Sequence, residues 1–145
     1  MVKHEEEIVE IFTKILEMMT FSVENLEFNG KQIGRSIFII NYVGKNEPCS
    51  LTNIYENTQF PASTASRRVD DLVKAGLIDR VQSTDDRRGI RVTLTEEGKL
   101  VHKLFKEHRI KSMKNFIKGF SEEEITIFSK VLHHLVENHE DIFVM

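Results

Sequence analysis

The stretch PASTASRRVDDLVKAGLIDRVQSTDDRRGIRVTL, residues 61–94, decides the fold, because its hydrophobic pattern changes from helical to extended. Pro61 suits the first turn of a helix and Gly76 suits a left-handed C-terminal cap, so we expect a helix between them. The segments 77–81 and 90–94 predict two strands, and the second alternates apolar and polar side chains. With the polar residues between them, they predict a β-hairpin with a long, charged tip.

Upstream of this stretch, apolar residues recur at helical spacing. A long amphipathic helix is predicted over residues 5–26, and Asn29-Gly30 breaks it from the next element. A second helix is predicted over residues 31–43, and a short third helix over residues 51–57, with Ser50 as its N-cap. The third helix and the helix after it outline a helix-turn-helix. The expected buried face of the second helix is Ile33, Ile37, Ile40 and Val43.

Downstream of the hairpin, two further long helices are predicted. Thr95 can cap the first of them, which extends to about residue 118 before Gly119. Ser121 and Glu124 have the spacing of a capping box and open the second. The expected apolar face of this last helix is Ile125, Phe128, Val131, Leu132, Leu135 and Val136.

The order of these elements predicts the fold class. We expect a mainly α-helical chain with a small β-hairpin wing, that is, a winged helix-turn-helix with long helices at both ends. At 145 residues the chain fits a single domain. Within that domain, residues 31–98 would form the winged-helix lobe, flanked by the helical segments 1–30 and 99–145.

The overall composition is that of an ordinary globular protein, with 40% hydrophobic and 30% charged residues. No apolar run approaches the roughly 20 residues that a membrane span needs, and the acidic N-terminus lacks the apolar core of a signal peptide. These features predict a cytoplasmic protein. The single Cys49 excludes an internal disulfide and is interpreted as a structural residue. The sequence shows no phosphate loop, nucleophile motif or zinc-spaced cluster, so neither catalysis, a cofactor nor a metal is expected.

Charge is distributed unevenly along the chain, whose net charge is −3. Glutamates dominate residues 1–30, whereas residues 61–91 hold six arginines. If Ala65, Val69 and Leu72 face the core, the helical step directs the hydroxyl and arginine side chains of this segment outward or to the flanks. Small hydroxyls let a helix enter the DNA major groove, where arginine reaches guanine or phosphate. The candidate DNA-binding residues of this helix are Ser63, Thr64, Ser66, Arg67 and Arg68.

The hairpin tip is a second candidate DNA contact. An arginine is attracted to the negative potential of a narrow minor groove, and a neighbouring carboxylate can hold its guanidinium in place. The candidate residues of the wing are Asp86, Arg87, Arg88 and Arg91. Two alternatives stay open: the tip could be a solvated turn that neutralises its own charge, and the helix hydroxyls could be simple caps.

The chain resembles the MarR (multiple antibiotic resistance regulator) family of transcriptional regulators. The resemblance rests on STASRRVDDL (63–72), GLIDR (76–80), DDRRG (85–89) and VTLTEEG (92–98). It implies a homodimer, built from the first, fifth and sixth helices, that binds a pseudo-palindromic operator. It also implies that Arg88 enters the minor groove, that Asp86 orients it, and that the major groove receives Ser63, Thr64, Ser66 and Arg67. Arg68 stands where the family more often has an apolar residue, and Asp71 where it often has a basic one.

The dimer is also expected from the long apolar faces of the first and last helices and from the apolar C-terminal tail, residues 142–145. The resemblance further suggests repression that a small-molecule effector relieves. A pocket for that effector is placed at Phe12, Phe38 and Phe105. The competing hypothesis is a winged-helix module that binds another protein instead of DNA.

Overall fold

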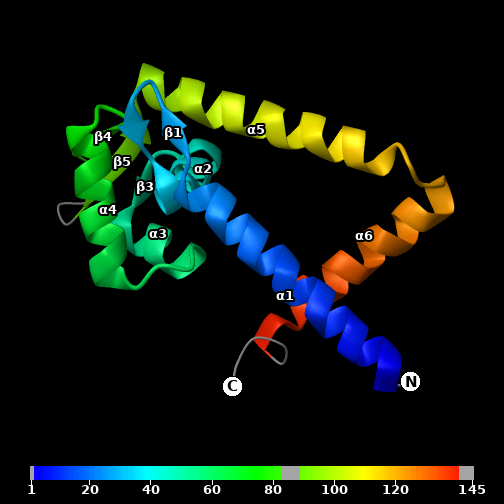
Figure 1. The fold of residues 1–145 in the computed structure, drawn as a ribbon. Coiled ribbons are helices and arrows are strands. Elements are labelled where there is room, and N and C mark those ends of the chain that lie inside the picture. Colours follow the sequence, from blue (N-terminus) through cyan, green and yellow to red (C-terminus); the bar gives the residue numbers. More distant parts are fainter. Residues whose placement is uncertain (1, 83–88, 141–145) are drawn as a thin grey trace. The chain divides into compact units, whose positions relative to one another are not determined.

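A computed structural model describes residues 2–82 and 89–140 (Figure 1). The chain forms two compact units, Met1–Leu104 and Phe105–Met145, and the boundary falls inside a long helix. The elements of the first unit are α1 (Val2–Glu24), β1 (Glu27–Phe28), β2 (Lys31–Gln32), the 3-10 helix η1 (Gly34–Ser36), α2 (Ile37–Asn46), β3 (Cys49–Ser50), α3 (Leu51–Asn57), α4 (Ala62–Lys74), β4 (Ile78–Gln82), β5 (Ile90–Leu94) and the first half of α5 (Glu96–Ile117). The second unit holds the rest of α5 and α6 (Glu122–Glu137).

The predicted fold class is confirmed, since helices, hairpin and end helices follow one another in the expected order. Local capping signals place several ends correctly. Ser50 and Asn53 form a capping box at α3, and Ser121 and Glu124 form another at α6. Gly76 takes a φ of +76° after α4, as its cap position requires.

The predicted second helix begins six residues later than expected, and this prediction was wrong for residues 31–36. Asn29 and Gly30 have φ angles of 49° and 75°, so both central residues of the turn are left-handed. Asn-Gly with two positive φ angles is the tight turn of a hairpin, and it joins β1 to β2. The helix then runs past Gly44 to Asn46.

The core of the first unit lies between α2, α3, α4 and the sheet (Figure 1). Ile37, Ile40 and Val43 of the expected α2 face are buried in that helix, whereas Ile33 is buried but precedes it. Fully burying an aliphatic side chain of this size contributes roughly 1.5–3 kcal/mol. Gly98, at the start of α5, faces the carbonyl oxygen of Leu77 so closely that a Cβ would clash. The largest fully buried side chains are Ile37, Ile39, Ile40, Ile54, Leu77, Ile78, Val43, Val69 and Val92.

The wing strands belong to a three-stranded sheet with the order β3-β5-β4. Both pairings are antiparallel, and Val92 at the centre of β5 faces Cys49 on one side and Arg80 on the other. The two-residue β3 was not predicted, because two residues are too few to show an alternating pattern. Thr95 follows the sheet, where its hydroxyl accepts a hydrogen bond from the Gly98 amide at 3.0 Å and caps α5 as predicted.

The Lys31 side chain ties the small β1-β2 hairpin to the rest of the first unit. Its ammonium group donates to the carbonyl oxygen of Ala75 at 2.6 Å, at the C-terminal end of α4. It also donates to both carboxylate oxygens of Glu97 at 2.9 Å, in the first turn of α5. A cation at the end of one helix and a carboxylate at the start of the next both match the helix dipoles.

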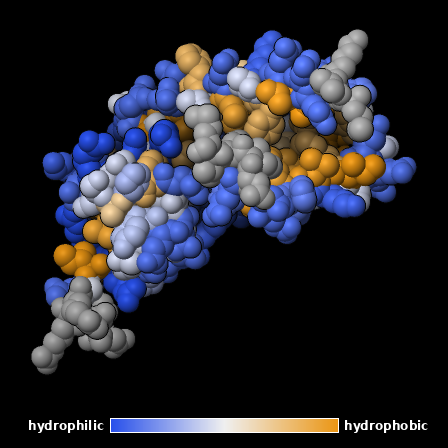
Figure 2. Space-filling view, turned by 90° about the horizontal axis from the view of Figure 1, so that it is seen from below, coloured by the Kyte–Doolittle hydropathy of each residue, from blue (hydrophilic) through white to orange (hydrophobic). Residues whose placement is uncertain are grey.

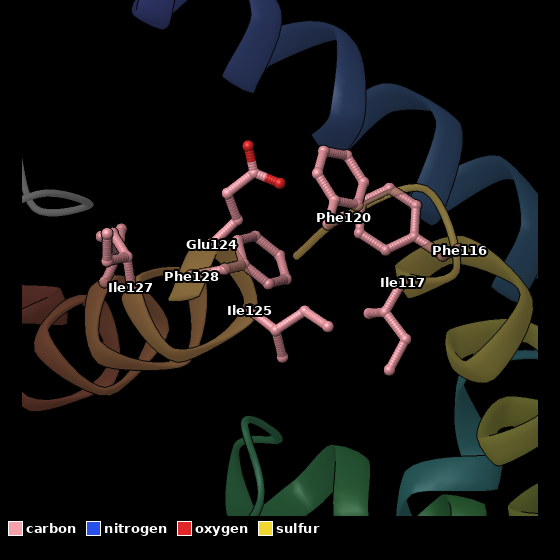
Figure 3. A pocket seen from close by; sticks show the side chains of 8 residues that line it. Phe116, Ile117, Phe120, Glu124, Ile125, Ile127 and Phe128 are labelled. Atoms are coloured by element: carbon pink, nitrogen blue, oxygen red, sulfur yellow. The ribbon is translucent and has the colours of Figure 1, made fainter. Parts of the chain in front are cut away.

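The second unit has a different character. None of the α6 side chains is buried. The rings of Phe116, Phe120 and Phe128 gather at one concavity of about 360 Å³, with centroids 5.5 and 5.9 Å from Phe116 (Figure 3). Hydrophobic side chains therefore lie open at the surface (Figure 2). None of the described helices has the length and apolar character needed to cross a membrane.

Candidate nucleic-acid interface

The exposed face of α4 is the candidate interface. Ala65, Val69 and Leu72 are buried, which confirms the predicted orientation of this helix. Ser63 and Arg67 are exposed on the opposite side, and Thr64 and Ser66 are half-buried at its flanks. Pro61 at the N-cap has no side-chain acceptor, so the first backbone N–H groups of α4 can bind an anion such as phosphate.

Arg68 is placed differently from the other four candidates of α4. Its guanidinium lies 4.9 Å from the centre of the Phe60 ring, and its Nη1 donates to the Ser36 hydroxyl at 3.1 Å. Burial lowers the pKa of Arg68, and the charges of Arg35 and Arg67 lower it further. The side chain is thus held against η1 and Phe60.

Arg35 is a basic residue of this region that the sequence did not suggest. Its guanidinium lies 5.5 Å from the centre of the same Phe60 ring, and the residue is exposed. Among the described residues, neither Arg35 nor Arg67 forms an ion pair. No local pattern could have identified Arg35, because η1 and α4 are brought together by the fold.

The wing is described in part. Asp86, Arg87 and Arg88 lie outside the described residues, so their predicted contacts stay predictions. Arg91 is half-buried on β5, opposite Val81 of β4 and Ser50 of β3. Arg91 therefore lies on the central strand of the sheet, between β3 and β4.

An ion pair between Arg80 and Asp70 connects the wing to α4. Asp70 lies on the helix and Arg80 on β4, and each side chain is a little under half exposed. Such pairs contribute little to stability because water screens them. The pair nevertheless links the two elements that were predicted to contact DNA, and the sequence analysis did not identify it.

Cys49 is buried on β3. Burial raises the pKa of its thiol, the Glu47 carboxylate raises it further, and the charge of Arg91 lowers it. A buried thiol with a raised pKa forms little of the reactive thiolate. This environment suits the structural role expected for Cys49.

The three phenylalanines of the predicted effector pocket occupy different parts of the chain. Phe12 is half-buried on α1, and Phe38 of α2 lines a concavity of about 470 Å³ with Arg35 and Tyr42. Phe105 belongs to the second unit, where the Arg109 guanidinium lies 5.2 Å from the centre of its ring. A shared pocket of the three stays a prediction. Within residues 2–82 and 89–140, no group of three His, Cys, Asp or Glu side chains could hold a metal ion.

Comparison with known proteins identifies the family of this chain. Residues 34–89, which include α4 and β4, match the sequence model of the MarR family. Over 103 residues, 69% of this chain, the sequence is 33% identical to the uncharacterized HTH-type transcriptional regulator YhjH of Bacillus subtilis. The chain belongs to the MarR family. This family comprises transcriptional regulators rather than enzymes.

Two further relatives of this MarR-family chain are informative. The structure of Streptococcus pneumoniae FabT, solved in complex with DNA, matches with a TM-score of 0.79 at 27% identity and covers 97% of both chains. The HTH-type transcriptional repressor YetL of Bacillus subtilis is 27% identical over 101 residues, 70% of this chain. The chain spans 59% of the length of YhjH and 60% of that of YetL.

Proposed function

We propose that this protein is a DNA-binding transcriptional regulator that inserts α4 into the major groove. The observation that carries the proposal is the N-terminal half of α4, which has no carboxylate and presents Ser63 and Arg67 to solvent beside the wing. Arginine in this position can bind guanine edges or phosphate. Membership of the MarR family and the likeness to FabT, which was solved in complex with DNA, support the proposal.

The other predicted contacts take their roles from this placement. Thr64 and Ser66 flank the groove-facing side of α4, and Arg88 at the wing tip enters the minor groove with Asp86 orienting it. Arg87 and Arg91 add positive charge near the phosphates. We further propose that residues 1–145 form a single MarR-like domain, with residues 31–98 as the DNA-binding lobe.

The protein acts as a homodimer in this proposal, formed by the helical segments 1–30 and 99–145. Supporting this, the apolar side chains of α1, α5 and α6 are widely exposed within one chain. Exposed apolar helix faces of this kind mark an interface, and two-fold symmetry would match a pseudo-palindromic operator.

We propose that the dimer represses transcription until a small-molecule effector releases it. Repression is supported by the likeness to YetL, which is named a repressor. Of the three predicted pocket residues Phe12, Phe38 and Phe105, Phe38 lines a concavity of about 470 Å³, a volume that suits a small ligand.

The proposal is tested with DNA fragments that wild-type protein selects from its own genome. Arg67→Ala and Arg88→Ala should each weaken binding by about 1–3 kcal/mol, while the circular-dichroism melt stays nearly unchanged. Wild-type affinity should fall steeply with salt, since phosphate contacts release counterions. Unchanged binding in the Arg67→Ala, Arg88→Ala double variant would contradict the geometry and favour a module that binds protein.

A further inference from the structure

Two arginine side chains meet at the side of the recognition helix, and a third, Arg67, lies next to one of them in the sequence. Arg35 of η1 and Arg68 of α4 both place their guanidinium groups on the Phe60 ring, at 5.5 and 4.9 Å from its centre. Burial lowers the pKa of Arg68, and the nearby positive charges of Arg35 and Arg67 lower it further. Neighbouring positive charges repel one another, and a bound anion would relieve that repulsion.

Arg68 and Arg35 differ in their freedom to bind such an anion. Arg68 is held by the Ser36 hydroxyl and the Phe60 ring, and the charge of Asp71 partly compensates its own. Arg35 is exposed, and no carboxylate of the described residues pairs with it. Stacking on Phe60 limits the directions its guanidinium takes, which lowers the entropy lost on binding.

The location of Arg35 suggests what the anion is. Arg67 lies on the exposed face of α4, and Arg35 acts on the same Arg68 from the side of η1. A helix in the major groove, which is about 12 Å wide, has rows of phosphates at both sides. A basic side chain beside the helix rather than on its groove face therefore meets the backbone and not the bases.

We propose that Arg35 binds a backbone phosphate of the DNA at the edge of the groove that receives α4. This inference rests on the proposed DNA-binding function and extends its contact surface from α4 and the wing to η1. A phosphate contact carries no sequence information, so Arg35 contributes affinity and register but not base preference.

The test compares Arg35→Ala with Arg109→Ala. Both changes remove one arginine that is exposed and stacks on a phenylalanine, but Arg109 lies in the second unit. Binding is measured between 50 and ~300 mM salt, a range in which phosphate contacts change affinity strongly. The probes are a duplex that wild type selects from a random-sequence pool and a scrambled duplex of the same composition.

Arg35→Ala should weaken binding to both duplexes by a similar factor, on the order of tenfold at low salt. Its slope of log K against log salt should be shallower by about 0.9 for each Arg35 in the complex, whereas the slope for Arg109→Ala should match wild type. Arg35→Lys should keep most of the slope, because it keeps the charge.

Three outcomes would overturn the inference. Equal affinities and slopes for Arg35→Ala and Arg109→Ala would show that Arg35 is a solvated side chain. A loss confined to the selected duplex would mean that Arg35 contacts a base. Absence of salt-dependent binding by wild type on either duplex would overturn the proposed function itself, and this inference with it. A circular-dichroism melt of each variant identifies any loss that comes from unfolding.

Discussion

Apolar side chains are buried in the winged-helix lobe but exposed on the helices at the chain ends. In the lobe, Ile37, Ile54 and Leu77 have no exposed surface at all. In the end helices, Phe21 of α1 and Val136 of α6 leave about 70% of their surface exposed. The lobe thus completes its core within one chain, whereas the end helices display apolar faces that one chain does not cover.

This difference separates two roles within the fold. A self-contained lobe can hold α4 and the wing strands in a fixed geometry, as the Arg80–Asp70 pair and the shared sheet do. The uncovered faces are where we propose that the second copy binds. Mutations in the lobe core should therefore lower stability, whereas mutations on the uncovered faces should weaken association.

The largest effect is expected in the lobe core. Ile54→Ala removes a fully buried side chain between α3 and its neighbours and should lower the free energy of unfolding by about 2–5 kcal/mol. Urea denaturation followed by circular dichroism measures this loss. Thr52→Ala, at an exposed position of the same helix, is the matched control and should change stability by less than about 0.5 kcal/mol. Equal losses at the two positions would show that Ile54 does not belong to a tightly packed lobe core.

The next effect is expected in α6 and concerns association. Val131→Asp places a charge on the apolar face of α6. This change should raise the dissociation constant of the dimer at least about tenfold. Sedimentation velocity over a range of concentrations measures this shift. Ser129→Asp adds the same charge at an exposed polar position and should leave association nearly unchanged. If both variants dissociate alike, the apolar face of α6 is not the interface.

The smallest effect is expected at Cys49. Because burial and Glu47 raise the pKa of its thiol, the folded protein at pH 8 should react slowly with a thiol reagent. The unfolded chain in urea should react at the rate of an ordinary cysteine. As the pH rises through the ordinary range of thiol pKa values, the reaction of Cys49 should become faster in the unfolded protein at a lower pH than in the folded protein. Fast reaction of the folded protein would show that the lobe opens at β3.

Local signals explain how much of the fold could be predicted from the sequence. Ser50, Gly76 and Ser121 each act on backbone groups within a few residues, so their effect is visible in the sequence. Asn29-Gly30 carried the same kind of signal for a hairpin, but its two-residue strands are too short to show an alternating pattern.

The candidate site was less predictable, because several of its contacts join distant parts of the chain. The outward direction of Arg67 follows from the helical step, and the structure agrees with it. Arg68 was grouped with it, yet Ser36 and Phe60 hold its side chain at the side of the helix. Neither partner could be identified before η1 and the α3–α4 turn were in place, and the same holds for Arg35.

DNA recognition by α4 and the wing is tested most directly by selecting and sequencing the genomic fragments that the purified protein binds. We predict an enriched pseudo-palindromic motif whose half-sites lie about one helical turn apart, since a two-fold dimer presents two copies of α4. The Arg67→Ala, Arg88→Ala variant should lose this enrichment. A protein that enriches no motif, or that enriches the same motif in the double variant, would contradict DNA recognition by α4 and the wing.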